Sequence, residues 1–294
     1  MKKLLLLGVM YLAAIAGFSQ NETDSVKVEP KWKLSGVTGV NFSQTSLVNW
    51  SAGGSNAVAG NIYLNGDLVH KNGKWLWENH LATDYGLSRI QNEGLRKTAD
   101  KFDFASKLGH QASEKWYYTG LFDFKTQFAK GYNYPNTDVY ISDFLSPAFS
   151  TLSVGAEYKP CDKFSLYYSP LAAKFTIVMD DSLSTLGLFG VDPGKHLKAE
   201  LGSYLKMGYK TQLMENVDLA SVLSLFTAYD KSFGNIDVDW DVIVNMKINK
   251  YMNAMINTTL KYDDDIKYID KNGVERGPRV QFKEILGIGL AYKF

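Results

Sequence analysis

The feature that most constrains this chain is a period of two in its apolar residues, which recurs in strand-length segments between Trp32 and Phe294. In the segment 238–249 the even positions are mostly large and apolar, whereas Asp239, Asp241 and Lys247 occupy odd positions. Successive side chains of a β-strand point to opposite faces of the sheet. Each segment is therefore predicted to form a strand with one apolar face and one polar face.

The connections between these segments alternate in length along the chain. Short turns, such as the one at Asn72-Gly73, favour tight hairpins. The connections in between are longer and are predicted at 43–57, 88–97, 129–150, 178–198, 230–237 and 263–279. Short turns on one side and long loops on the other are typical of a membrane barrel. The sequence thus predicts an all-β fold, a transmembrane antiparallel β-barrel of outer-membrane type with about twelve strands.

The composition suggests that many aromatic residues contact a membrane. Hydrophobic residues make up 45% of the chain and aromatic residues 14%. After residue 20 the sequence has no apolar run long enough for a membrane-spanning helix, so the rings are expected on the outside of the barrel. The net charge of +1 argues against a nucleic-acid partner. The lone Cys161 cannot form an internal disulfide bond.

The first residues have the pattern of an export signal. Lys2 and Lys3 precede an apolar run and a small-residue exit at 16–19. This pattern predicts a cleaved signal peptide over 1–20, followed by a flexible lead-in over 21–31 and a barrel domain over 32–294. The alternative is a buried N-terminal helix. The expected location is the outer membrane of a Gram-negative bacterium.

The last strand carries a stripe of large residues on one parity, ending at Tyr292 and Phe294. These two rings are predicted to lie at the periplasmic membrane interface, where aromatic girdles occur. The ending resembles the C-terminal recognition strand of bacterial outer-membrane proteins, which implies the barrel assembly machinery as a partner during biogenesis. Outer-membrane lipids and lipopolysaccharide are the other expected partners. The alternative is an ordinary terminal strand of a soluble barrel.

The stretch 41–61 is unusual because it is polar but uncharged, with a glycine pair inside it. Its candidate ligand or lumen residues are Asn41, Ser43, Gln44, Asn49, Trp50, Gly53, Gly54 and Asn56. We expect either a loop that folds inward to narrow the lumen or bind a neutral polar ligand, or a structural loop capped by Trp50. The same residues resemble the signature of a family of uncharacterised outer-membrane barrel proteins from the Bacteroidota. The resemblance implies a fold and a location, but no activity.

Three ionisable residues share the polar parity of one predicted strand: Glu78, His80 and Asp84. They could bind a cation in the lumen or form a polar ladder. No motif supplies a nucleophile, a base and an oxyanion donor together, so the chain is not expected to be an enzyme. No Cys/His cluster has metal-ligand spacing, and neither a metal nor a cofactor is expected. The acidic run 263–265 is interpreted as a solvated loop.

The sequence favours a narrow pore, or a binding or transport protein, for small polar or amphipathic solutes. Lys125, Asp239, Asp241 and Lys247 are expected to fill much of the lumen. The aromatic loop 129–150 could stack on sugars or plug the pore, or it could form an interface girdle and a rigid turn. The alternatives are a structural, lipid-contacting envelope protein without an open channel and, less favoured, a lipid-active enzyme.

Overall fold

The computed structural model describes residues 31–46, 55–91, 93–230, 233–269 and 275–294. The predicted signal peptide and nearly all of the lead-in lie outside the described residues, as do Asn49, Trp50, Gly53 and Gly54.

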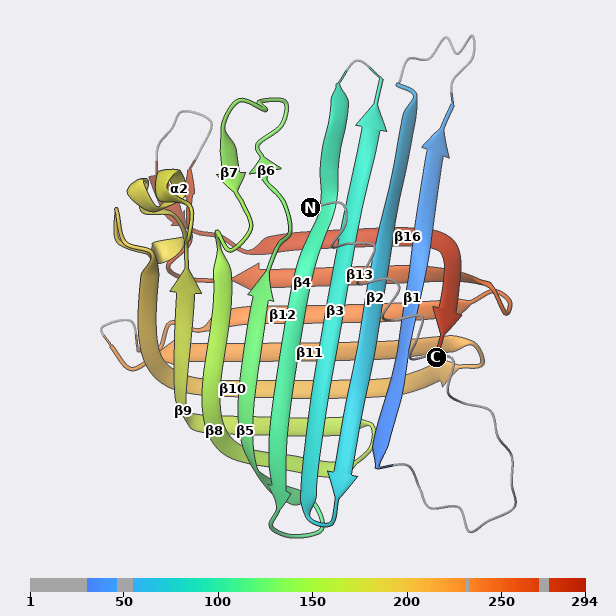
Figure 1. Cartoon of the computed structure of the whole chain (residues 1–294), viewed down its shortest axis with the longest axis vertical. Helices are drawn as coiled ribbons and strands as arrows, with labels where there is room; N and C mark the ends of the chain where they lie inside the picture. Colours follow the sequence, from blue (N-terminus) through green and yellow to red (C-terminus); the bar gives the residue numbers. More distant parts are fainter. Residues whose placement is uncertain (1–30, 47–54, 92, 231–232, 270–274) are drawn as a thin grey trace. The chain divides into compact units, whose positions relative to one another are not determined.

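Twelve strands close into one antiparallel barrel (Figure 1), which confirms the predicted fold class. The strands are β1 (Trp32–Thr45), β2 (Ala57–Asn72), β3 (Trp75–Ile90), β4 (Gly94–Gln111), β5 (Trp116–Thr126), β8 (Ala148–Cys161), β9 (Phe164–Ile177), β10 (Leu197–Met214), β11 (Val217–Ala228), β12 (Asp237–Lys247), β13 (Met252–Tyr262) and β16 (Gln281–Lys293). Each strand pairs with its neighbours in chain order, and β1 pairs with β16 to close the ring. No sheet edge is left along the paired part of the barrel, as a membrane barrel requires.

The longer connections carry small elements of their own. The hairpin of β6 (Gly131–Tyr132) and β7 (Tyr140–Ser142) lies between β5 and β8. The helix α2 (Asp181–Thr185) and the 3-10 turn η2 (Leu188–Gly190) lie between β9 and β10, and β14 (Lys267–Ile269) pairs with β15 (Glu275–Pro278) before β16. Within the described residues no helix has the length and apolarity to span a membrane.

One predicted loop is wrong. The expected long connection at 88–97 is instead a short one, because β3 and β4 stay paired as far as Ile90 and Gly94. The register shifts by one residue between Gly86 and Leu87, which is the mark of a β-bulge. Beyond this bulge both faces of the pair carry polar and charged residues such as Arg89 and Arg96, so the alternation that predicts a strand is lost although the pairing continues.

The outer face of the barrel is apolar. Large side chains on the outward parity are exposed on nearly every barrel strand: Leu34, Val40, Phe42, Ile62, Trp77, Leu108, Phe122, Leu152, Val154, Leu171, Leu201, Trp240, Phe282, Leu286, Ile288 and Leu290. A soluble monomer rarely exposes more than a few hundred Å² of contiguous apolar surface. An apolar band around a closed barrel is therefore a surface for hydrocarbon.

The inner face is polar and tightly filled. The buried polar side chains on barrel strands include Asn41, Asp84, Thr119, Asp123, Ser153, Glu157, Lys174, Glu200, Ser224, Asn253, Asn257 and Thr259. One apolar cluster lies among them: Leu121, Tyr167, Ala172, Tyr204, Phe226 and Ala228. The interior is consequently a packed, hydrogen-bonded bore rather than a wide aqueous channel.

Phe294 lies at the seam where the barrel closes. Its backbone exchanges two hydrogen bonds with Gly36, at 2.9 and 3.0 Å. Its ring covers Gly36 so closely that a Cβ added there would lie 2.6 Å from the ring. The ring also stacks on Tyr292, with the centroids 6.3 Å apart. The two predicted aromatic residues thus lie together on the outer face, at the short-turn end of β16.

Candidate functional site in the lumen

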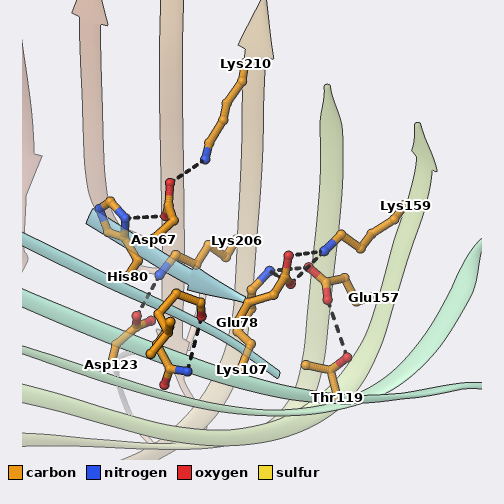
Figure 2. A network of polar contacts seen from close by, with 12 residues as sticks. Asp67, Glu78, His80, Lys107, Thr119, Asp123, Glu157, Lys159, Lys206 and Lys210 are labelled. Atoms are coloured by element: carbon orange, nitrogen blue, oxygen red, sulfur yellow. Dashed lines mark hydrogen bonds and ion pairs between the residues drawn. The ribbon is translucent and has the colours of Figure 1, made fainter. Parts of the chain in front are cut away.

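The short-turn half of the lumen holds a cluster of alternating charges, the Glu78 cluster (Glu78, Lys107, Thr119, Glu157 and Lys159), shown in Figure 2. Glu78 on β3 accepts from Lys159 at 2.6 Å and lies 3.2 Å from Lys107. Lys107 also donates to Glu157 at 2.5 Å, and Thr119 lies 3.5 Å from the other oxygen of Glu157. Side chains from β3, β4, β5 and β8 thereby join in a single network.

A second group beside this cluster reaches across the barrel. Asp67 accepts from the Nδ1 atom of His80 at 2.7 Å and lies 3.4 Å from Lys210. Lys210 belongs to β10, and β10 and β2 stand opposite each other in the closed order of twelve strands. Asp123 on β5 accepts at 2.6 Å from Lys206 on β10, three strands away in the ring (Figure 2). Such bridges narrow the lumen because they fill its diameter with side chains.

A second layer of ion pairs crosses the lumen toward the long loops. Lys101 on β4 lies 3.1 Å from Asp241 on β12, again a strand on the opposite side of the barrel. Lys125 donates to Asp239 at 2.7 Å, and Thr259 donates to Asp241 at 2.5 Å. Lys125, Asp239 and Asp241 therefore fill the lumen as the sequence predicts. Lys247 is different, because it lies exposed at the short-turn end of β12.

Next to this layer is a partly enclosed cavity of about 160 Å³, called here the Lys283 cavity. Its lining residues are Asp100, Lys101, Asp103, Lys125, Thr126, Gln127, Pro147, Phe149, Thr259, Lys261 and Lys283. Gln127 and Pro147 flank the loop that carries the β6–β7 hairpin, so the cavity lies toward the long-loop end of the bore. Its lining is mostly charged and polar, and Pro147 and Phe149 are its apolar part.

The predicted line of Glu78, His80 and Asp84 faces the lumen, but its members do not bind one another. Glu78 pairs with lysines and His80 pairs with Asp67, whereas Asp84 accepts from Asn61 at 2.8 Å. In the part of the chain that the structure describes, no group of three His, Cys, Asp or Glu side chains is arranged to hold a metal ion. Each of the three side chains thus has its own partner on another strand.

Residues of the stretch 41–61 take different positions. Asn41 faces inward, is 3% exposed and donates to Asn61 at 3.1 Å, which links it through Asn61 to Asp84. Ser43 and Gln44 are exposed and lie on β1, paired with β2, so this part of the predicted loop is a strand. Asn56 donates to Gln91 at 2.9 Å between the neighbouring ends of β2 and β3. The inward-folding segment that we predicted would include 47–54, which lie outside the described residues.

The loop 129–150 borders the mouth of the lumen. Gln127 donates to the backbone oxygens of Asp143 and Ser146, at 2.8 and 3.1 Å, and fixes the base of the loop. Phe149 lines the Lys283 cavity, whereas Tyr140 packs beside the buried residues of the next loop. The tyrosines of this loop do not line the cavity.

The next loop is held together by a helix cap. Asp180 accepts from the Leu183 N–H at 3.0 Å and from the Tyr140 hydroxyl at 2.9 Å. The Leu183 hydrogen bond holds the pKa of Asp180 below its usual value, because it favours the charged carboxylate. The two outer loops are therefore tied to each other at the rim.

The sequence did not single out Lys101, Lys261 or Lys283 as site residues. A signal was present, since the period of two places each on the polar parity of its strand. What the pattern cannot supply is which strands face each other across the bore.

A closed antiparallel barrel with an apolar outside and an ion-paired inside defines the class: it is a β-barrel of the outer-membrane type. Residues 42–132, about a third of the chain, match the model of a family described as "Protein of unknown function (DUF3078)". The comparison with curated proteins found no match.

Several solved structures are similar to the chain at low identity. The COG4313 outer membrane channel from Pseudomonas putida F1 has 12% identity and a TM-score of 0.41, with 93% of this chain and 100% of that chain covered. The translocator domain of autotransporter NalP from Neisseria meningitidis has 10% identity and a TM-score of 0.36, with 98% and 95% covered. The NanC porin has 8% identity and a TM-score of 0.36, with 88% and 100% covered. These likenesses are distant, and the fold is defined by the strand order of the chain itself.

Proposed function

We propose that this protein is an outer-membrane barrel that takes up small polar solutes at its long-loop end and passes them through a narrow lumen. The observation that carries the proposal is the apolar exterior around a polar bore, with a small polar cavity toward its long-loop end. Ion pairs between opposite strands, Lys101–Asp241 and Lys210–Asp67, narrow the passage without making it apolar. A bore of this kind favours a slow, size-limited passage over a wide porin-like flux.

The proposal includes the route to the membrane. A cleaved signal peptide over 1–20 exports the chain, and the barrel assembly machinery inserts it by way of a terminal strand ending at Tyr292 and Phe294. Outer-membrane lipids contact the apolar band, and lipopolysaccharide contacts the outer rim. The mass of the purified mature chain tests the cleavage, and fractionation of the cell envelope tests the location.

Conductance tests the passage. Refolded protein in a planar bilayer is expected to show a small conductance, and Lys101→Ala with Asp241→Ala is expected to raise it, because the double change removes one bridge and leaves no charge of that pair behind. The matched control is Asp192→Ala with Lys195→Ala, which removes an exposed ion pair in an outer loop. If neither the native barrel nor the double variant conducts or admits solutes into vesicles, the proposal is wrong and a structural envelope protein becomes the better assignment.

The proposal assigns no catalysis to the barrel. Lipid turnover by the purified, folded protein would contradict this, and His80→Ala separates turnover by the lumenal histidine from turnover by a contaminant.

A further inference from the structure

The Lys283 cavity has an excess of cationic side chains. Four of its lining residues are lysines and two are aspartates. Asp100 is fully engaged elsewhere, since it accepts from Lys97 at 2.7 Å and from the backbone N–H groups of Phe128 and Ala129. Asp103 lies 3.0 Å from Lys101. The carboxylates that line the cavity therefore already have partners.

Three of the four lysines also have carboxylate partners, but Lys283 does not. Lys101 pairs with Asp103 and Asp241. Lys125 and Lys261 share Asp239, at 2.7 and 3.6 Å. Lys283, in contrast, has no carboxylate within ion-pair distance among the residues that the structure describes. Asp84 and Asp241 attract it only from beyond ion-pair distance. Asp84 already accepts from Asn61, and Asp241 from Lys101 and Thr259.

A partly enclosed ammonium group without a partner has lost part of its hydration and gains strongly from a bound anion. The charge of the surrounding groups suits an oxyanion. Thr126 and Gln127 already donate their side-chain hydrogens to backbone oxygens of the loop, so Lys283 is the main free donor. Lys261 and Lys101 add positive charge from neighbouring walls. Pro147 and Phe149 form an apolar wall that fits a short hydrocarbon chain.

We infer that the Lys283 cavity is a binding site for a small oxyanion, the carboxylate or phosphate group of a small solute, with Lys283 as its principal cationic contact. Because the inference names the solute class for the lumen, it rests on the proposed function. The size of the cavity limits the ligand to a few heavy atoms at the charged end. Selectivity by charged side chains in a pore lining follows the same physics.

Binding is tested on the full, folded chain in detergent at low ionic strength, by calorimetric titration with inorganic phosphate and, in a second arm, with butyrate. Lys283→Gln is expected to weaken binding by about tenfold or more, because one charge-assisted contact is lost. Lys283→Arg is expected to retain binding within a few fold. Lys247→Gln is the matched control, since it makes the same change on an exposed lysine at the opposite end of the barrel.

The two arms and the conductance assay separate the outcomes. Tighter binding of butyrate points to a carboxylate solute, and tighter binding of phosphate to a phosphorylated one. If neither anion binds the native barrel, or if both bind folded Lys283→Gln equally well, the inference is overturned. Folding of each variant is checked by its resistance to SDS before boiling. Anion binding without conductance contradicts the proposed passage but supports the anion site. Conductance without anion binding supports the passage but contradicts the anion site.

Discussion

Lys107 provides a sharp test of the ion-paired lumen. The side chain of Glu157 is 2% exposed, and its contacts are Lys107 at 2.5 Å and Thr119 at 3.5 Å. Lys107→Met keeps most of the aliphatic length of the side chain but removes the charge. Glu78 keeps Lys159 as a partner at 2.6 Å, whereas Glu157 is left as a buried carboxylate with one weak contact.

The expected cost of Lys107→Met is about 3–5 kcal/mol in the free energy of unfolding, the usual result of removing one partner of a buried ion pair. The matched control is Lys293→Met. Lys293 lies 2.9 Å from Asp218, but the two side chains are 62% and 47% exposed. An exposed pair of this kind contributes at most about 1 kcal/mol. Both lysines lie within 3 Å of a carboxylate, but only the Lys107 pair is buried, so burial is the main difference that the two costs compare.

Urea unfolding from phospholipid vesicles, followed by tryptophan fluorescence, measures both variants. Adding Glu157→Gln to Lys107→Met removes the unpaired charge and is expected to recover at least about 2 kcal/mol. If Lys107→Met costs no more than Lys293→Met, water reaches Glu157 freely and the lumen is not the packed, desolvated bore described here. The same conclusion follows if Glu157→Gln recovers nothing.

Three further perturbations test the outer face, the seam and the rim. Val154 lies in the middle of β8 and is 58% exposed, so Val154→Lys is expected to lower the free energy of unfolding in vesicles by about 2–4 kcal/mol, whereas Leu186→Lys on an outer loop lowers it little. Equal losses of stability would contradict the assignment of Val154 to a lipid-facing surface. Gly36→Ala is expected to cost about 1–3 kcal/mol, because its Cβ meets the Phe294 ring at 2.6 Å and a backbone oxygen at 2.5 Å, and Gly120→Ala, with open space around it, is the control. The cap at Asp180 contributes stability above the ordinary carboxylate pKa and loses it as the pH falls through the lowered folded pKa, so protection of 178–196 from protease should decline in acid. Asp180→Asn keeps the cap without this pH dependence, and a native profile that is flat in acid would contradict the assignment.

The direction in which each side chain points could be predicted from the sequence. A period of two is a local property, so Glu78, His80 and Asp84 were assigned to the lumen and Leu286 and Tyr292 to the outside, as the structure has them. The closed barrel followed from the same pattern together with the alternation of short and long connections. The paired ends of β3 and β4 escape this logic. Beyond the bulge at Gly86 both of their faces carry polar and charged residues, so the pattern there predicts a loop although the pairing continues.

The partners inside the lumen could not be predicted in the same way. Lys125 and Asp239 are 114 residues apart, and Lys210 and Asp67 are 143 apart. Choosing them from the sequence would require the number of strands, the register of every pair and the bulges that shift it, as at Gly86. An error of one residue in any register turns a side chain from the lumen to the lipid. The polar parity alone leaves many equivalent combinations of lysine and carboxylate.

Lysines therefore have two different roles in this bore. The role of each depends on whether a carboxylate lies within ion-pair distance of its ammonium group. Lys107 forms ion pairs with both Glu78 and Glu157. These carboxylates cancel its positive potential locally, so little of that potential attracts a solute. Lys283 has no ion-pair partner in the described part of the chain, so its positive potential extends into the cavity that it lines. Removing Lys107 should thus lower stability and leave anion binding nearly unchanged in the molecules that remain folded. Removing Lys283 should weaken anion binding with little cost in stability. If both changes affect both properties equally, the lumen behaves as one averaged electrostatic field, and the distinction between paired and unpaired lysines has no functional content.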